Sequence, residues 1–467
     1  MLDVNVAIIS EMKAFLRISC ERYELQQLFT TNVSTDFCRN RKLGFERLIL
    51  LITRLCKRTL SLELERFFHD LSDASLHAPL SDRPSPSSLL PCSVSAFSQQ
   101  RKKLHPCFFP LWNEVLYKSF YHYGDLAVNG SRIKRWRNLR VIAADGSSVA
   151  LVSNPALKAH FGGQSNQQGE FCAAKTFYYY DVLNELIVDA RIAPYRTGEL
   201  SIAYSQVHKL ADDSVTVYDR NFCNYRMMAL HLWAERPKRF LIRAKEQLGF
   251  IAEFLAGGSE DEIITLFPPT ADTIKKMRQS GFVVTANSGI QIRLVKVILP
   301  SGGIEVLATN LMAADGYCAE DLKELYFLRW GVETSISFQK NILMLESFSG
   351  QSVVSVEQDF YATVLVANLQ MCLIKDAQIT LDEQRSSGAR QEDKHPVQVN
   401  RNKSAARIKE RILDLFIREE PSEILRQLHQ CFIRDVLPVR KGRSFERRRK
   451  NRRLNSKHKT FTNYKPA

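Results

Sequence analysis

Residues 141–147 read Val-Ile-Ala-Ala-Asp-Gly-Ser, and the prediction of a sheet starts from this stretch. It lies inside a longer run, 139–151, whose composition predicts a β-strand. Apolar residues flank Asp145, so its carboxylate is costly there without a partner or a metal ion. A turn before Gly146 is the structural alternative for this acid.

The elements that follow this strand are expected in the order strand, strand, helix, strand, helix, strand. They are predicted at 171–180, 185–192, 198–210, 214–218, 224–235 and 239–243, with a hairpin turn at 181–184. Three meandering strands followed by alternating helices and strands is the order of a ribonuclease-H-like sheet. The predicted fold class is therefore α/β, with a ribonuclease-H-like catalytic core.

This strand order predicts that Asp145 and Asp219 lie side by side. Asp219 directly follows strand 214–218, and in such a sheet the first and fourth strands are neighbours. Two carboxylates this close need a cation between them. Mg²⁺ suits that role, because it is bound by a few carboxylates together with water and phosphate oxygens. A pair of such ions can activate a water or a 3′-hydroxyl and stabilise the leaving oxygen of an in-line displacement. The structural alternative for Asp219 is a helix cap.

A third acid lies on a helix predicted from about Ala319 to Lys340. At 100° per residue, Tyr326, Arg329, Glu333 and Lys340 fall within an arc of about 60° on one face of this helix. A carboxylate is thus presented beside a phenol, a guanidinium and an ammonium. An exposed face with ordinary salt bridges is the alternative. Gly331 falls in the opposite, apolar arc, where a missing side chain would let the helix approach a sheet closely.

The regions outside this core have their own character. Residues 1–130 are predicted to be mainly helical, and 245–315 are predicted to form a β-rich insertion. After a Pro- and Ser-rich break at 83–91, Ser93 or Ser95 can cap a short helix. Amides and cations on that helix suit contact with DNA, although a surface helix without a ligand is the alternative. These side chains are Gln99, Gln100, Arg101, Lys102 and Lys103.

The charge of the chain favours a polyanionic partner. The formal net charge is +15, from 65 Lys and Arg against 50 Asp and Glu, and the sequence pI is about 9.3. Eleven Lys or Arg but one acid lie between Arg440 and Lys459. Such a basic tail can grip phosphates even when it has no fixed structure, and a solvated tail is the structural alternative.

Cysteine spacing and hydropathy predict a protein of the cytoplasm. None of the ten cysteines forms a Cys-x-x-Cys pair or lies at zinc spacing from paired histidines, so they are expected to be reduced core residues. The longest apolar runs, 48–52 and 361–374, are too short or too polar to span a bilayer, and no membrane partner is expected.

Several motifs together resemble the bacterial insertion sequence 4 family of DDE transposases. Asp145, Asp219 and the Tyr-(2)-Arg-(3)-Glu-(6)-Lys pattern from Tyr326 to Lys340 carry the resemblance. Asp-Arg-Asn-Phe at 219–222 is similar to the family's motif around its second aspartate. The segments 95–101, 345–350 and 358–363 extend the likeness over roughly residues 90–375.

The resemblance implies a catalytic triad of Asp145, Asp219 and Glu333 that also binds two Mg²⁺ ions, with Mn²⁺ as a substitute. It implies cleavage at transposon ends and joining of the 3′-hydroxyls to target DNA. The protein would work as a homodimer on double-stranded DNA, in a synaptic complex in the bacterial nucleoid. The implied DNA contacts are Tyr326, Arg329, Lys340 and Arg220.

The same resemblance suggests domain boundaries and leaves two alternative functions open. The predicted regions are 1–130 (helical, DNA-binding), 135–244 and 316–376 (core), 245–315 (insertion) and 377–467 (C-terminal region with the basic tail). Relatives stack a tryptophan of the insertion on a flipped base. This chain has no tryptophan between Trp233 and Trp330, so hairpin chemistry is not carried over. A nuclease without strand transfer and a DNA-binding regulator without catalysis are the alternatives.

Overall fold

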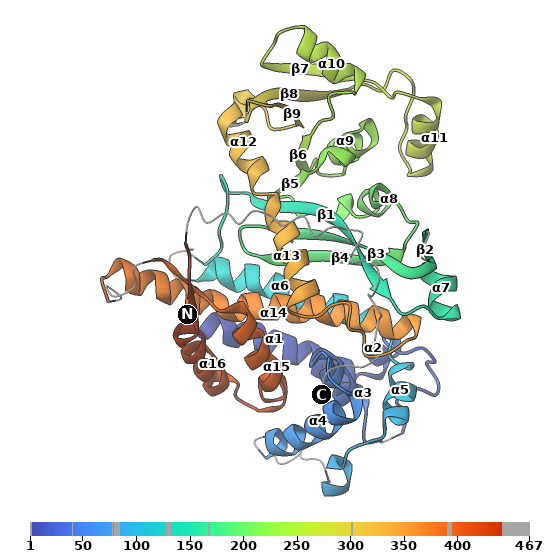
Figure 1. The fold of residues 1–467 in the computed structure, drawn as a ribbon, viewed down its shortest axis with the longest axis vertical. Helices are drawn as coiled ribbons and strands as arrows, with labels where there is room; N and C mark the ends of the chain where they lie inside the picture. Colours follow the sequence, from blue (N-terminus) through green and yellow to red (C-terminus); the bar gives the residue numbers. More distant parts are fainter. Residues whose placement is uncertain are drawn as a thin grey trace. The chain divides into compact units, whose positions relative to one another are not determined.

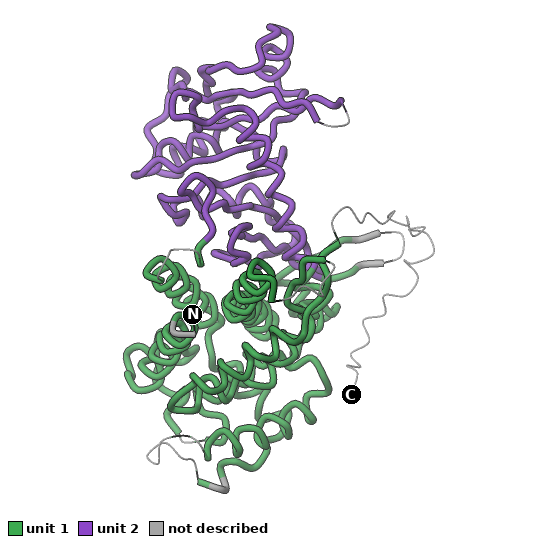
Figure 2. Tube along the Cα trace, turned by 90° about the vertical axis from the view of Figure 1, so that its left-hand side faces the viewer, with its two compact units in different colours: residues 1–133, 150–172, 338–467 green, residues 134–149, 173–337 purple. Residues whose placement is uncertain are grey.

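The computed structural model of the chain describes residues 2–39, 41–76, 78, 85–127, 132–166, 169–299, 302–389 and 395–440. The chain divides into two compact units, coloured separately in Figure 2. Unit 1 comprises Met1–Ile133, Ala150–Cys172 and Phe338–Ala467, and unit 2 comprises Lys134–Val149 and Ala173–Ser337. Apart from Arg440, the basic run that ends at Lys459 lies outside the described residues.

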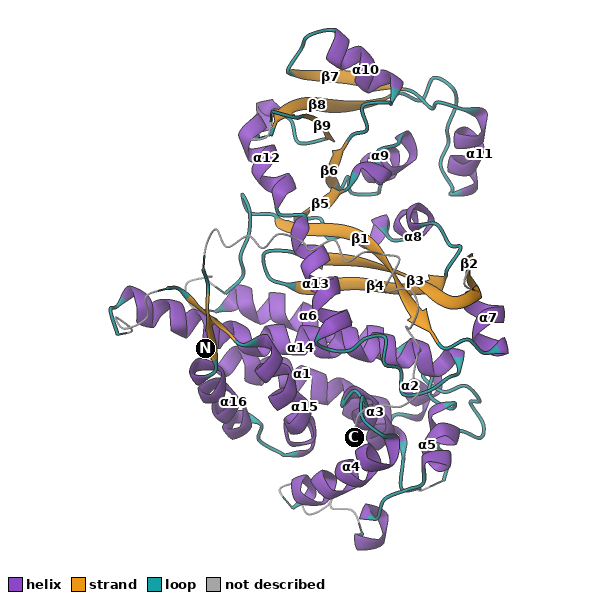
Figure 3. Ribbon diagram, viewed as in Figure 1, coloured by secondary structure: helices purple, strands orange, loops and turns teal. Residues whose placement is uncertain are grey.

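Unit 1 is mainly helical, which confirms the prediction of a helical N-terminal region (Figure 3). Ser93 caps α5 by accepting a hydrogen bond from the Ala96 amide, 3.2 Å away, as one of the two predicted caps. The helices of the unit are α1 (Leu2–Glu21), α2 (Tyr23–Leu28), α3 (Phe45–Thr53), α4 (Leu60–Ser75), η2 (Pro86–Leu89), α5 (Val94–Arg101), α6 (Phe108–Leu126), α7 (Pro155–Phe161), α14 (Val353–Ser386), α15 (Arg401–Ile417) and α16 (Ser422–Arg434). Its strands are β2 (Gly163–Asn166), β10 (Val397–Val399) and β11 (Val436–Pro438).

Helix α14 forms the centre of unit 1, where α6, α3, α15 and α16 pack against it (Figure 1). Nearly all side chains of its central part are buried, as in a helix surrounded by protein. Its buried polar side chains are paired; for example, Asn368 donates to Asn113 over 2.8 Å. Among the described residues, α14 is the one helix long and apolar enough to cross a membrane, and 78% of its most apolar stretch is buried inside the protein. The buried central helix of a protein core can have the same length and apolar composition.

Unit 2 is built on a mixed sheet. Its strands are β1 (Arg140–Leu151), β3 (Gly169–Asp181), β4 (Leu186–Pro194), β5 (Ser214–Tyr218), β6 (Arg239–Arg243), β7 (Asp261–Leu266), β8 (Ile290–Ile298) and β9 (Ile304–Thr309). Its helices are α8 (Glu199–Tyr204), η3 (Val207–Lys209), η4 (Arg220–Phe222), α9 (Tyr225–Leu232), α10 (Gly249–Ala256), α11 (Ala271–Gln279), η5 (Ala313–Asp315), α12 (Ala319–Phe327) and α13 (Trp330–Asn341). The last two residues of β1, the first four of β3 and the last four of α13 belong to unit 1.

The strands of this sheet lie in the order β2-β3-β1-β5-β6-β9-β8-β7, and β4 also pairs with β3. β1, β5 and β6 are parallel, whereas β9, β8 and β7 are added antiparallel to the edge of β6. The inserted strands therefore extend the same sheet. Besides these three strands, the region predicted as a β-rich insertion contains the helices α10 and α11.

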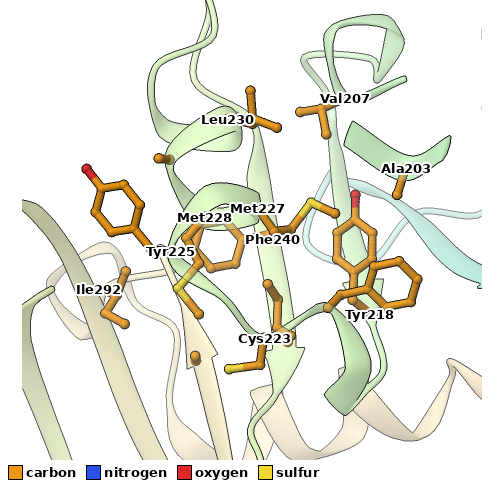
Figure 4. Close-up of a cluster of buried hydrophobic side chains, with 14 of the residues drawn as sticks. Ala203, Val207, Tyr218, Cys223, Tyr225, Met227, Met228, Leu230, Phe240 and Ile292 are labelled. Carbon is orange, nitrogen blue, oxygen red and sulfur yellow. The ribbon is translucent and has the colours of Figure 1, made fainter. Parts of the chain in front are cut away.

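The two faces of the sheet have separate hydrophobic cores. One face packs on α8 and α9, and Figure 4 shows part of this cluster, with Tyr218, Met228 and Phe240 among its members. The other face is formed by alternate residues of the same strands, such as Val141 and Val217, and packs on α12. Because side chains of a strand point alternately to its two faces, residue parity decides which core each side chain enters.

His231 is fully buried within the first of these cores. Its Nε2 lies 3.0 Å from the hydroxyl of Tyr218, which in turn lies 3.2 Å from the hydroxyl of Tyr179. Burial lowers the pKa of His231 to about 3. The side chain is therefore neutral in the folded protein at neutral pH.

We expect this histidine to make the protein less stable in acid. The unfolded chain binds a proton at His231 below pH 6.5, whereas the folded chain binds it only near pH 3. Between these values, the free energy of unfolding falls by about 1.4 kcal/mol per pH unit for one such group. Urea denaturation at pH 7, 6 and 5 should show a shallower pH dependence for His231→Gln, which takes up no proton. Equal slopes for the two proteins would contradict this prediction.

Candidate active site

Asp145 and Asp219 share one register position on neighbouring parallel strands. β1 pairs with β5 through Arg140↔Ser214 to Ala143↔Val217, and the same offset carried two residues further joins Asp145 to Asp219. The predicted adjacency of these two strands is confirmed. The two acids also share a face, because each is an even number of residues from Val141 or Val217, which pack on α12.

The surroundings of Asp145 perturb its acidity. Its Oδ1 accepts a hydrogen bond from the Gly146 amide over 2.9 Å, and its Oδ2 lies 3.8 Å from Nη1 of Arg329. Burial raises the pKa of Asp145 to about 6; Arg329 and the Gly146 amide oppose this rise, whereas the charges of Glu333 and Asp219 add to it. Asp219 and Glu333 therefore both lie within electrostatic range of Asp145. A strongly perturbed carboxyl group of this kind is typical of a functional site.

A guanidinium group lies between two of these acids. Arg329 is buried, and its Nη2 donates to Oε1 of Glu333 over 2.8 Å while its Nη1 faces Asp145. Its charged group also lies 5.0 Å from the ring centre of Trp330. Arg329 therefore supplies a positive charge to Asp145 and Glu333.

The donor set suits a hard divalent ion, since all three groups offer carboxylate oxygens. In the part of the chain that the structure describes, however, no group of three or more His, Cys, Asp or Glu side chains lies close enough together to hold a metal ion. Glu333 has 40% of its side chain exposed and is bonded to Arg329. The structure therefore brings the acids near one another without closing a three-ligand site.

Asp219 also has the structural role considered for it. Its Oδ1 accepts a hydrogen bond from the Asn221 amide over 2.8 Å and so caps η4. The cap uses one carboxylate oxygen. Arg220, which follows directly, is exposed to solvent.

The single helix expected to carry four of the site residues is broken, which corrects the prediction. α12 ends at Phe327 and α13 begins at Trp330. Tight turns join them, in which the Arg329 amide donates to the Tyr326 carbonyl over 3.1 Å. The break falls beside Gly331, a poor helix former, whose Cα approaches Val182 so closely that a Cβ would lie 3.2 Å from that side chain. The expected close approach of Gly331 to the sheet is confirmed.

The four predicted residues are consequently distributed over two helices and their junction. Tyr326 lies in the last turn of α12; burial raises its pKa, and the charges of Arg329 and Arg243 oppose this rise. Glu333 lies in the first turn of α13, and Lys340 lies in the last turn of that helix, within unit 1. Phe327, next to Tyr326, is 75% exposed.

Arg243 is a residue that the sequence reasoning missed. The β5–β6 pairing runs from Val215↔Arg239 to Tyr218↔Ile242, so the next step joins Asp219 to Arg243. Asp145, Asp219 and Arg243 thus form one row across three parallel strands. Arg243 pairs with Glu305 over 2.8 Å, and its charge opposes the rise in the pKa of Tyr326. Arg243 ends the predicted strand 239–243, the next strand along the chain after Asp219, and this position could have indicated it.

Two side chains of α5, the helix predicted to contact DNA, are instead buried inside unit 1. For Gln100 and Arg101 the prediction was therefore wrong. Arg101 is buried and donates to Asp359 over 2.8 Å, to the Gln358 Oε1 over 2.9 Å and to the Ser349 hydroxyl over 2.7 Å. Gln100 donates to the Leu43 carbonyl over 2.9 Å. The three motifs at 95–101, 345–350 and 358–363 therefore meet in one buried network inside unit 1.

Comparison with known proteins agrees with this geometry. The chain matches the family described as "Transposase DDE domain" over residues 136–369, half of its length. It is 24% identical over 90 residues to the "Putative transposase InsZ" of Escherichia coli (strain K12), a match that spans 19% of this chain and 30% of that protein. A solved piggyBac transposase synaptic complex with hairpin DNA aligns over 94% of this chain and 84% of its own at 12% identity, with a TM-score of 0.37, which is too low to establish a shared fold. On the match over residues 136–369, the chain belongs to the transposase DDE domain family.

Proposed function

We propose that this DDE transposase serves a bacterial insertion sequence of the insertion sequence 4 type, cutting DNA at the element's terminal inverted repeats and joining the 3′-hydroxyls to target DNA. One observation carries the proposal: Asp145 and Asp219 share a register position on adjacent parallel strands, with Glu333 in electrostatic range. A ribonuclease-H-like core is part of the proposal, and the order β4-β3-β1-β5-β6 supports it. The proposed regions are 1–130 (helical, DNA-binding), 135–244 and 316–376 (core), 245–315 (insertion) and 377–467 (C-terminal region).

Asp145, Asp219 and Glu333 are the proposed ligands of two Mg²⁺ ions, which Mn²⁺ can replace. Bound ions of this kind activate the attacking water or 3′-hydroxyl and stabilise the leaving oxygen. The two aspartates are held on one face of the sheet by the strand register. To bind an ion together with the two aspartates, Glu333 would have to release its hydrogen bond with Arg329.

The side chains around the acids are proposed to hold the DNA backbone. Arg329 is proposed to bind a DNA phosphate, because a guanidinium can donate two parallel hydrogen bonds to a phosphate group. Arg243 lies within electrostatic range of Tyr326, and the two side chains are proposed to share a second phosphate. Arg220 is exposed directly after Asp219, and Lys340 lies in the last turn of α13.

The assembly proposed is a homodimer that synapses two double-stranded DNA ends in the nucleoid. The net charge of +15 supports a polyanionic partner. Purified protein is incubated with DNA from both flanks of its coding region, with Mg²⁺ or with EDTA. Mg²⁺-dependent cuts at inverted repeats are expected. Cuts without joining favour a nuclease, and binding without cuts favours a regulator; either result overturns the transposase proposal.

A further inference from the structure

The side chain of Glu199 packs directly on Gly146, the residue after Asp145. A Cβ built on Gly146 would lie 2.4 Å from Cδ, 2.5 Å from Oε1 and 2.6 Å from Cγ of Glu199. Non-bonded carbon atoms normally lie about 3.5–4.0 Å apart. Position 146 therefore accepts only glycine while Glu199 keeps its place.

A lysine holds Glu199 in this position. Nζ of Lys175, on β3, donates to Oε1 of Glu199 over 3.1 Å, and the same Nζ lies 5.5 Å from the ring centre of Tyr195. The two charged side chains are only 20% and 26% exposed. A largely buried carboxylate needs such a partner to offset its loss of hydration. Glu199 thus has a specific contact, beyond the general preference for an acid in the first turn of a helix.

The Gly146 peptide connects this pair to Asp145. Its amide donates to Oδ1 of Asp145 over 2.9 Å and so fixes the orientation of the carboxylate. Asp145 faces α12, whereas α8, which begins at Glu199, packs on the opposite face of the sheet. Contacts therefore run from Lys175 through Glu199 and Gly146 to Asp145. They support β1 from the face of the sheet opposite to Asp145.

We propose that Glu199, held by Lys175, is a positioning residue for Asp145. It supports the Gly146 peptide from the far face of the sheet and thereby orients the Asp145 carboxylate toward the metal. This rests on the proposed function, in which Asp145 is a metal ligand. Residues that orient metal ligands in this indirect way commonly contribute 10- to 100-fold to metal affinity or activity.

The test compares full-length variants by calorimetric titration with Mn²⁺ alone. Glu199→Ala is expected to weaken Mn²⁺ binding about tenfold, because the support under Gly146 is lost. Glu199→Gln is expected to stay within about threefold of the wild type, since it keeps the shape and still accepts a hydrogen bond from Lys175. Gly146→Ala pushes Glu199 aside and should match Glu199→Ala. The double variant should be no weaker than either single variant, because both act through one contact.

The control is Asp212→Ala, which removes a different lysine-paired carboxylate of unit 2, that of the Lys238 pair. It should bind Mn²⁺ as the wild type does, and melting temperatures should confirm that all variants fold. Wild-type affinity in Glu199→Ala overturns the proposal, and so does an equal loss in Glu199→Gln, because charge would then matter in place of position.

Asp145→Asn, measured in parallel, separates this proposal from the one on which it rests. If Asp145→Asn loses Mn²⁺ affinity while Glu199→Ala keeps it, only the positioning role fails. If Asp145→Asn or the wild-type protein gives no evidence of a metal ligand at Asp145, the proposed function and the positioning role fail together.

Discussion

Asp145→Asn is expected to lower the rate of DNA cleavage by about a thousandfold or more. The substitution keeps the size of the side chain and its hydrogen bond with the Gly146 amide, but it removes the charge that is proposed to hold a metal ion. Metal ions contribute several kcal/mol to the stabilisation of such a transition state, and about 4 kcal/mol corresponds to a thousandfold change in rate. Single-turnover cleavage of end DNA measures the effect.

Asp189→Asn is the matched control for this variant. Asp189 lies within a strand of the same unit, is paired with Arg191 over 3.1 Å, and has 23% of its side chain exposed, against 21% for Asp145. We expect it to cleave at the wild-type rate. Both variants should bind end DNA as the wild type does, because neither loses a cation. A cleavage rate for Asp145→Asn within tenfold of the wild type would remove Asp145 from the site.

Asp359→Asn is expected to destabilise the protein by about 3–5 kcal/mol, the usual cost of leaving one partner of a buried ion pair uncompensated. Burial alone would raise the pKa of Asp359, but the charges of Arg101 and Lys57 and the Ser349 amide hold it below its ordinary value. The substitution leaves the Arg101 guanidinium buried without its counter-charge. Urea denaturation at neutral pH measures the loss.

Glu21→Gln is the control for the second variant, because it removes a carboxylate from an exposed pair with Arg17 in the same unit. Exposed pairs of this kind contribute less than about 1 kcal/mol. If Asp359→Asn is no less stable than Glu21→Gln, the network around Arg101 does not hold unit 1 together. Wild-type DNA binding by a folded Asp359→Asn protein would further support a structural role for this network.

The sheet could be predicted because its signals are local. Apolar runs of four or five residues, separated by turn residues, gave the positions of β1, β5 and β6 to within a residue or two. The neighbouring positions of Asp145 and Asp219 followed from the order of those strands. In the insertion, by contrast, α10 and α11 are only eight and nine residues long, and the local pattern of such short segments does not separate a helix from a strand.

The remaining site geometry depends on contacts between residues distant in sequence. The angle calculation placed Tyr326 and Glu333 on one straight helix, but the approach of Gly331 to Val182 accompanies a break that local periodicity does not reveal. Likewise, Arg101 reads as a free cation until Asp359, 258 residues later, is placed beside it. The pattern identified the residue types of the site, and tertiary packing determined their partners.

The most direct test of the central claim is strand transfer with DNA ends already cut. End DNA with a free 3′-hydroxyl is mixed with target plasmid, Mg²⁺ and either wild-type protein or one of the variants Asp145→Asn, Asp219→Asn and Glu333→Gln. We expect the wild type to form covalently joined products and each variant to form none. Failure of the wild-type protein to join the DNA, or joining by any one of the three variants, would contradict the claim that these acids act together in transposition.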